Sequence, residues 1–242
     1  MRLIHFIPVM VITSIVYSQA MYVSDYNDYV GILASYDSLD SYDAENSVVV
    51  HTTTSISVAG SYIFNGTLEL GIEYGKSDFK IKNDIGFENY MDGSEYSFEG
   101  GYHIKELLPV NIALRGFYKS MSFNSELLDE SDSKLSEIGN GFGVEFYKSV
   151  LKDDTMELIP FVGIRKMTIN SKFDDSNGDS IEVEGNSDTF TFGLGVKFNN
   201  FVLEASVKQI DGESEFSSTV GFIIPQKNIL FKPPLTYLLP VK

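Results

Sequence analysis

The acidic segment between residues 175 and 186 is spaced like a calcium-binding loop. Asp175, Asn177 and Asp179 place oxygen-bearing side chains at alternate positions, and Glu182 follows three residues later. Alternate oxygen ligands are typical of the EF-hand loop, which also needs glycine at its sixth position and glutamate at its twelfth. Here the glycine falls at the fourth position and the twelfth is Asn186. We therefore expect a hydrated acidic turn, with weak binding of divalent cations as the alternative.

Residues for acid–base or nucleophilic catalysis are scarce. Beyond residue 20 the only histidines are His51, near Asp43 and Glu45, and His103, near Lys105. A general base must lie within hydrogen-bonding reach of the proton that it removes, and neither histidine stands in a recognisable catalytic pattern. The absence of cysteine excludes disulfides, thiolate metal sites and a cysteine nucleophile. We interpret both histidines as structural residues and expect neither enzymatic activity nor a cofactor.

Eleven charged residues share one feature: each stands in a stretch where apolar residues occupy every second position. On a β-strand, residues at that spacing lie on one face and the charged residues lie on the other. If these charged faces meet in a common interior, we expect the six acids and five bases to pair, because an unpaired buried charge is very costly. The predicted interior network comprises Glu69, Glu73, Glu95, Glu99, Arg115, Lys119, Glu145, Arg165, Lys197, Glu204 and Lys208.

Residues 1–20 are ordered like a secretory signal peptide. Arg2 gives a positive start, an apolar run extends to Val16, and Ser18 and Ala20 place small residues before a cleavage point. No later stretch approaches the ~18 uncharged apolar residues of a transmembrane helix, so the exported product is expected to be a soluble protein or a β-barrel. The chain carries 34 acidic and 18 basic residues. That excess argues against nucleic acid as a partner, because binding to phosphates requires a basic surface.

The remaining chain repeats one module, in which a strand, a tight turn and a second strand precede a longer acidic segment. Residues 56–64 alternate in character and lead into Asn65 and Gly66, a strong signal for a two-residue hairpin turn. A closed single-chain barrel of the bacterial type has an even number of strands. We predict ten strands, with eight as the fallback, in one domain over residues 21–224. The predicted strands span residues 29–37, 48–64, 67–81, 94–104, 110–124, 136–151, 157–172, 187–198, 201–210 and 215–224.

Alternation alone does not show which face meets water, but three features favour lipid on the apolar face. The polar faces are rich in glycine and serine, which suit a crowded interior, and tyrosine and phenylalanine are frequent at strand ends. Five segments that alternate with the tight turns hold 24 acidic residues and one base, so they are expected to form loops at one end. These segments are residues 21–46, 84–95, 126–137, 173–188 and 211–215.

We therefore predict an all-β, closed, antiparallel, up-and-down transmembrane barrel with its charges in the lumen. The competing arrangement is a soluble barrel that holds a ligand. It would place Phe190, Phe192 and Phe198 along the axis and turn the charges outward.

The signal segment, the hairpin module at residues 57–74, the stretch 159–163 and the last strand at 217–224 together resemble the small outer-membrane β-barrel superfamily, similar to OmpA- and OmpX-type barrels. The resemblance implies location in the outer membrane, contact with its lipid and lipopolysaccharide, insertion by the barrel insertion machinery, and a monomer. Such barrels usually end on an aromatic of the last strand, whereas here Phe222 precedes a proline-rich extension at residues 225–242.

Taken with the near balance of interior charges, these expectations favour a mostly plugged lumen, acidic extracellular loops and a structural or surface-interaction role. A selective pore would place one sign of charge at a constriction. A narrow porin-like pore for small solutes is the alternative. An enzyme at the outer rim that uses His51 is a further hypothesis.

Overall fold

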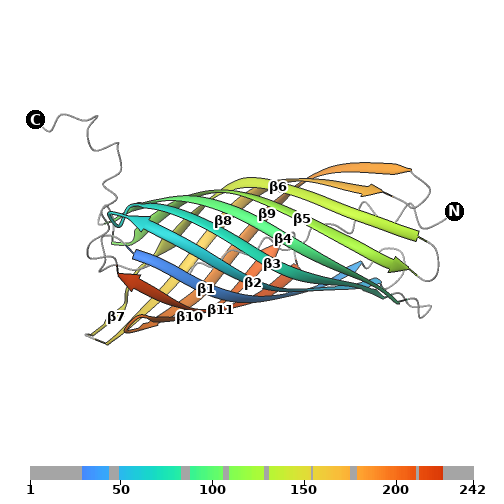
Figure 1. Cartoon of the computed structure of the whole chain (residues 1–242). Helices are drawn as coiled ribbons and strands as arrows, with labels where there is room; N and C mark the ends of the chain where they lie inside the picture. Colours follow the sequence, from blue (N-terminus) through green and yellow to red (C-terminus); the bar gives the residue numbers. More distant parts are fainter. Residues whose placement is uncertain are drawn as a thin grey trace, which may run out of the picture.

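The computed structural model describes residues 29–43, 49–82, 88–105, 109–127, 131–153, 155–174, 179–210 and 213–225. Within them, the chain forms ten long strands and one two-residue strand, β7. Figure 1 shows the long strands wrapping around a common axis with a pronounced tilt. The strands are β1 (Tyr29–Asp43), β2 (Val49–Phe64), β3 (Leu68–Lys82), β4 (Glu88–Ile104), β5 (Asn111–Leu127), β6 (Ser131–Tyr147), β7 (Leu151–Lys152), β8 (Met156–Asp174), β9 (Ser180–Phe198), β10 (Phe201–Ile210) and β11 (Glu213–Pro225).

The sheet is a closed antiparallel barrel of ten strands. Each long strand pairs with the next along the chain, and β1 closes the sheet against β11, from Tyr29 opposite Pro225 to Leu39 opposite Glu215. The short β7 pairs only with the start of β8 among the described residues, while β6 passes β7 and pairs directly with β8. The predicted fold class and the count of ten strands are confirmed, because closure requires all ten.

Tight turns connect the strands at one end of the barrel. Asn65 and Gly66 adopt positive φ angles of 48° and 61°, as a two-residue hairpin turn requires, and Asn199 has φ 53° in the turn between β9 and β10. At the other end the connections at residues 44–48, 83–87, 128–130, 175–178 and 211–212 lie outside the described residues. The signal segment and the extension beyond Pro225 lie outside them too.

All five segments that we predicted as acidic loops belong largely to strands. β1 runs to Asp43, and β4, β6, β9 and β11 begin at Glu88, Ser131, Ser180 and Glu213, so the loop predictions for 21–46, 84–95, 126–137, 173–188 and 211–215 were wrong over most of their length. The apolar alternation fades in these segments, but backbone pairing continues, as between Asp132 and Glu126. Backbone hydrogen bonds extend a hairpin arm whether or not its side chains are apolar.

The apolar faces point outward along the whole wall. Phe190, Phe192 and Phe198 are 46%, 47% and 54% exposed, whereas every interior charge predicted from the alternation is at least 92% buried. The soluble barrel with these phenylalanines along its axis is therefore wrong. No helix of the described residues is long and apolar enough to cross a membrane.

The interior contains apolar clusters that the sequence did not predict. One cluster near the tight turns joins Tyr29, Leu33, Ile63 and Ile223 with Ala59 and Val202. A second lies at the opposite end, where Met91, Met121, Phe123 and Leu135 pack together. Two smaller clusters comprise Ala113, Tyr147, Ile159 and Phe161, and Phe117, Met167 and Ile169. Charged groups and apolar groups thus share the lumen, and the apolar clusters hold positions that we expected to be small or polar.

Candidate functional site: the charged interior

Arg115 of β5 is the centre of the interior charge network. Its Nη1 lies 2.9 Å from Glu69 Oε2 and also contacts Glu99 Oε1, while its Nε donates to Glu145 Oε2 at 2.7 Å. Arg165 of β8 donates from Nη2 to the other oxygen of Glu145 at 2.5 Å. One guanidinium therefore joins β5 to β3, β4 and β6, and Glu145 extends the network to β8.

Glycine makes room for this network. Across the sheet, Glu69 stands opposite Gly101, Gly101 opposite Arg115, Arg115 opposite Gly143, and Gly143 opposite Arg165. A Cβ added at Gly143 would lie 2.7 Å from Cγ of Arg165. Long charged side chains and glycines thus alternate around the inner wall, which accounts for the glycine-rich polar faces noted in the sequence.

His103 belongs to the same network. Its Nε2 lies 2.9 Å from Glu69 Oε2 and its Nδ1 lies 3.0 Å from the hydroxyl of Tyr147. The ring is 97% buried. Both ring nitrogens therefore contact wall residues, which is the arrangement of a structural histidine. The side chain of the other candidate, His51, lies outside the described residues.

A second group surrounds Lys119. Its Nζ lies 2.9 Å from Glu95 Oε2. Glu95 also accepts hydrogen bonds from Ser55 Oγ at 2.7 Å and Ser77 Oγ at 2.8 Å. One buried carboxylate thus bonds to β2, β3 and β5 from its place on β4. Such multiple partners offset the cost of removing the charge from water.

Glu73 is held by hydroxyl groups. Ser97 Oγ donates to Glu73 Oε2 at 3.0 Å, and Ser57 Oγ donates to the other oxygen. Serine on both neighbouring strands, β2 and β4, therefore takes the place of a basic partner at hydrogen-bonding distance.

Lys208 of β10 has two carboxylate partners. Its Nζ lies 2.7 Å from Glu215 Oε1 and 3.4 Å from Asp37 Oδ1. Lys197 of β9 lies 4.0 Å from Glu157 Oε2. Glu204 is buried on the inner face of β10. All eleven residues of the predicted network are therefore buried on the inner face. Arg115, Lys119 and Lys208 are the centres of three groups, whereas Lys197 lies nearest Glu157 and Glu73 bonds to serines.

The interior is more acidic than the sequence indicated. In the described part of the chain, ten carboxylates and five Lys or Arg side chains are buried. The four additional acids are Asp37, Glu137, Glu157 and Glu215. Asp37, Glu137 and Glu215 stand where the predicted acidic segments overlap the ends of the predicted strands 29–37, 136–151 and 215–224, and Glu157 is the first residue of the predicted strand 157–172. The alternation of the first three strands already places those acids on the inner face, opposite to the exposed Tyr36, Phe142 and Phe216.

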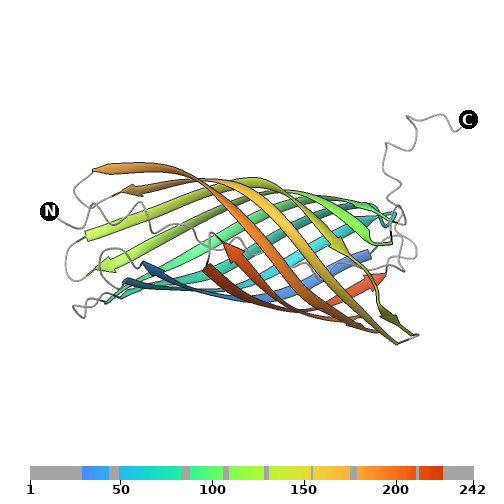
Figure 2. The same cartoon turned by 180° about the vertical axis from the view of Figure 1, so that it is seen from behind.

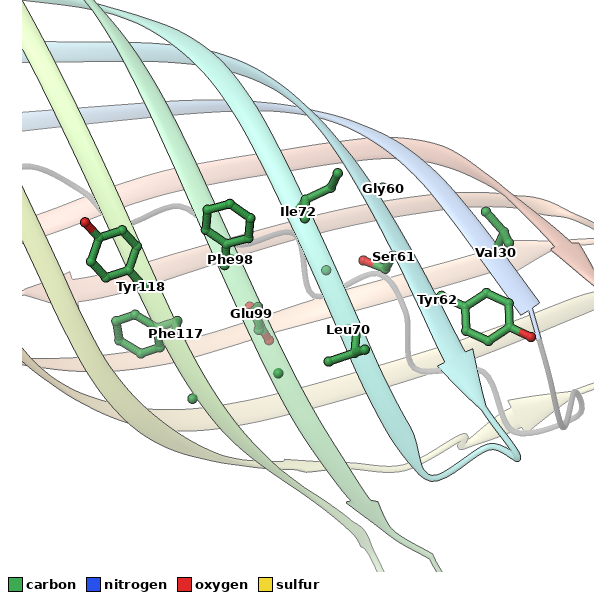
Figure 3. Close-up of a pocket in the computed structure, with 13 residues that line it drawn as sticks. Val30, Gly60, Ser61, Tyr62, Leu70, Ile72, Phe98, Glu99, Phe117 and Tyr118 are labelled. Atoms are coloured by element: carbon green, nitrogen blue, oxygen red, sulfur yellow. The ribbon is translucent and has the colours of Figure 1, made fainter. Parts of the chain in front are cut away.

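The outer wall carries an apolar hollow across β2 to β5. Gly60, Gly100 and Gly116 face outward there, and a Cβ added at any of them would meet no atom closer than 4.0 Å. Leu70, Ile72, Phe98 and Tyr118 are among the residues around it, and its volume is about 720 Å³. Figure 3 shows Phe98 and Tyr118 on neighbouring strands at one side of the hollow. Its outer face is apolar, so it suits hydrocarbon better than a polar ligand.

The candidate calcium loop falls partly outside the described residues, because Asp175 and Asn177 lie in the segment 175–178. Asp179 and Glu182 are exposed. In the portion that the structure describes, no three acidic or histidine side chains are grouped in a way that could hold a metal ion.

No family model and no curated protein matches the sequence. Among solved structures, the fold is similar to the translocator domain of the autotransporter NalP from Neisseria meningitidis, with 9% identity and a TM-score of 0.52 over 84% of this chain and 90% of that chain. It is also similar to the β domain of the Bordetella autotransporter BrkA, with 7% identity and a TM-score of 0.51 over 81% and 98%. At such identities the likeness shows the barrel fold alone, and it does not single out the OmpA- and OmpX-type barrels.

Proposed function

We propose that the chain is an integral outer-membrane barrel with a mostly occluded lumen, acidic extracellular loops and a structural or surface-interaction role. The observation that carries this proposal is the network around Arg115, which joins Glu69, Glu99 and Glu145 across the inside of the wall. A barrel of this strand number has little interior space beyond its side chains. Cross-links among long buried side chains leave little of that space for a solute.

The membrane location is supported by the outer surface. Large apolar side chains such as Ile72 and Phe142 are 62% and 64% exposed, far more than a water-soluble wall would show over so many strands. A closed barrel satisfies its backbone hydrogen bonds without water, which hydrocarbon requires. Outer-membrane lipid, whose chains would fill the hollow at Gly60, Gly100 and Gly116, and lipopolysaccharide are the proposed surroundings. We further propose export by the signal segment, insertion by the barrel insertion machinery, and a monomer.

Planar-bilayer recording tests the occluded lumen. Refolded protein inserted into a bilayer should give no steady single-channel conductance, because the pairs around Arg115 and Lys119 obstruct the axis. A general porin inserted into the same bilayers serves as the positive control. Regular, ohmic openings by the unmodified chain would contradict the proposal.

A narrow pore for small solutes is the second candidate, and the acidic interior gives it a specific form. With twice as many buried carboxylates as buried Lys and Arg side chains in the described residues, such a pore would favour cations. A salt gradient across the bilayer would give a reversal potential of the sign expected for cation selectivity. Anion selectivity would eliminate this candidate.

A further inference from the structure

The wall of the barrel has a deep notch at the end opposite the tight turns. β10 ends at Ile210, which stands opposite Thr189 of β9. β9 nevertheless continues for nine more residues, to Ser180. On the other side of the notch, β1 pairs with β11 only as far as Leu39 and continues to Asp43. Figure 2 shows β10 and β11 stopping part-way along the barrel while the strands beside them run on.

Among the described residues, the notch leaves one edge of β9 without a neighbouring strand. Residues 180–187 pair with β8, from Ser180 opposite Asp174 to Ser187 opposite Met167. In the part of the chain that the structure describes, they pair with no strand on the other side. Every second residue of an antiparallel strand directs both its N–H and its C=O toward that side. Such an edge is a template for the backbone of another extended segment.

The side chains along this edge differ between its two faces. Glu182 and Glu184 point outward and are exposed, while Ile181 and Val183 are half-buried on the inner face. Lys172 of β8 stands opposite Glu182 on the side of β9 away from the notch, and Asn170 stands opposite Glu184. An added strand would therefore meet acidic groups outside and apolar groups inside.

A buried hydroxyl marks the base of the notch. Ser187 is 99% buried, and its Oγ has no hydrogen-bond partner among the described residues. It stands on the inner face of β9, two residues beyond Thr189, the last residue paired with β10. A strand that continued the line of β10 would place its own groups beside this hydroxyl. An unsatisfied buried hydroxyl at the end of an unpaired edge is an independent sign that the site accepts a partner.

The width of the notch fits strand addition. Two strands, β10 and β11, separate β9 from β1 elsewhere in the wall. At the usual spacing between strands the opening is about 14 Å across, enough for one or two added strands.

Charge selects among the possible occupants. A second copy of the chain would bring Glu182 and Glu184 against the same acidic edge. The segment that follows Pro225 begins at the tight-turn end, which is the end of the barrel opposite the notch. We propose that the notch binds an extended segment of another protein, with Lys or Arg on one face and apolar residues on the other, as an added strand on β9. This inference deepens the proposed surface-interaction role and rests on it.

Binding of a strand-forming peptide tests this directly. The probe is a dye-labelled peptide of about nine residues in which lysine and valine alternate, added to the full chain refolded in detergent and followed by fluorescence anisotropy. The double substitution Glu182→Lys with Glu184→Lys should weaken binding about tenfold or more, because it reverses the charge along the edge. Asp78→Lys with Asp92→Lys is the matched control, since both acids are exposed on strands that pair with each other. It should leave the affinity nearly unchanged.

A peptide of the same sequence with every internal amide N-methylated distinguishes strand addition from simple charge attraction. It keeps the charges but has no N–H groups to pair, so it should bind at least about tenfold more weakly. Equal binding of the two peptides, or equal effects of the two double substitutions, would overturn the inference. Both results are independent of conductance, so a pore would refute the occluded lumen without deciding this test.

Discussion

At the scale of single residues, the barrel depends on buried charges that each have several partners. Arg115 contacts three carboxylates and Glu95 accepts from two serines and a lysine. A charge removed from water is tolerable only when hydrogen bonds and opposite charges replace the lost hydration. The partners in this network therefore mainly offset the cost of burying its charges.

Replacing Arg115 with methionine should lower the free energy of unfolding by about 3–5 kcal/mol, because it leaves Glu69, Glu99 and Glu145 buried without their shared cation. Urea unfolding in lipid vesicles measures the change. Lys166→Met is the control, since Lys166 and Asp188 are exposed and 4.0 Å apart. It should cost less than about 1 kcal/mol. Equal effects of the two substitutions would contradict a structural role for the Arg115 network.

Replacing glycine with alanine should have opposite effects on the stability of the barrel at two positions, Gly221 and Gly100. A Cβ at Gly221 would lie 2.4 Å from the backbone oxygen of Ile32, so Gly221→Ala should destabilise the barrel by about 1–3 kcal/mol. A Cβ at Gly100 would meet only Leu70 at 4.0 Å, so Gly100→Ala should be neutral or slightly stabilising. The same unfolding assay compares them. A larger loss at Gly100 than at Gly221 would show that the inner and outer faces are misassigned.

At the scale of strands and turns, the alternation in the sequence was sufficient to predict the number of strands and the direction of most side chains. It failed where the regular row of outward apolar residues stops before the strand does, as from Glu88 to Asp92 and from Ser180 to Asn186. Backbone pairing there depends on neighbouring strands that a single strand's pattern does not reveal. Glu137 and Glu215 were counted as loop acids although the predicted strands 136–151 and 215–224 already included them.

The partners within the interior could not be predicted from the sequence. Alternation places Arg115 and Glu145 on the inner face, but which side chains meet depends on the register between strands. That register brings Gly143 between Arg115 and Arg165. The inward apolar clusters were also missed, because residues such as Leu33 and Phe123 follow the polar alternation of their strands and look exceptional in sequence.

The turn before β8 should be sensitive to acid. Asp153 Oδ1 accepts hydrogen bonds from the backbone N–H groups of Thr155 at 2.8 Å and Met156 at 2.7 Å, and these hold the pKa of the carboxyl below its usual value of 3.8. A lowered pKa in the folded state stabilises the fold above pH 3.8, and the contribution disappears as pH falls through the folded-state pKa. Asp153→Ala should therefore reduce stability at neutral pH, and its difference from the unmodified chain should shrink on acidification.

Thermal unfolding in detergent at a series of pH values measures this difference. Asp153→Asn keeps the shape of the side chain without the charge, so its stability should lack the acid-dependent contribution. A constant gap between Asp153→Ala and the unmodified chain down to strongly acidic pH would refute the assignment.

At the scale of the whole molecule, the closed sheet has an outer and an inner surface of opposite chemical character. The outer surface presents large apolar side chains, and the inner surface presents carboxylates, bases, glycines and a few apolar clusters. The barrel closes by pairing of β1 with β11. Because β10 and β11 are the shortest of the ten long strands, the wall extends least far at this hairpin, at the end opposite the tight turns. The outer surface suits hydrocarbon and the inner surface suits pairing between charged side chains. The notch gives access to an edge of β9 that pairs with no other strand in the described part of the chain.

The most direct test of these facings uses tryptophan, which the chain lacks. Phe192→Trp introduces one on the outer face of β9, and Phe161→Trp introduces one on the inner face of the neighbouring β8, one register position away. In vesicles of brominated lipid, the fluorescence of Trp at position 192 should be strongly quenched and that at position 161 should be nearly unaffected, provided that both variants keep the folded gel mobility. Equal quenching, or stronger quenching at position 161, would contradict a barrel that turns its apolar face to lipid and its charges to the lumen.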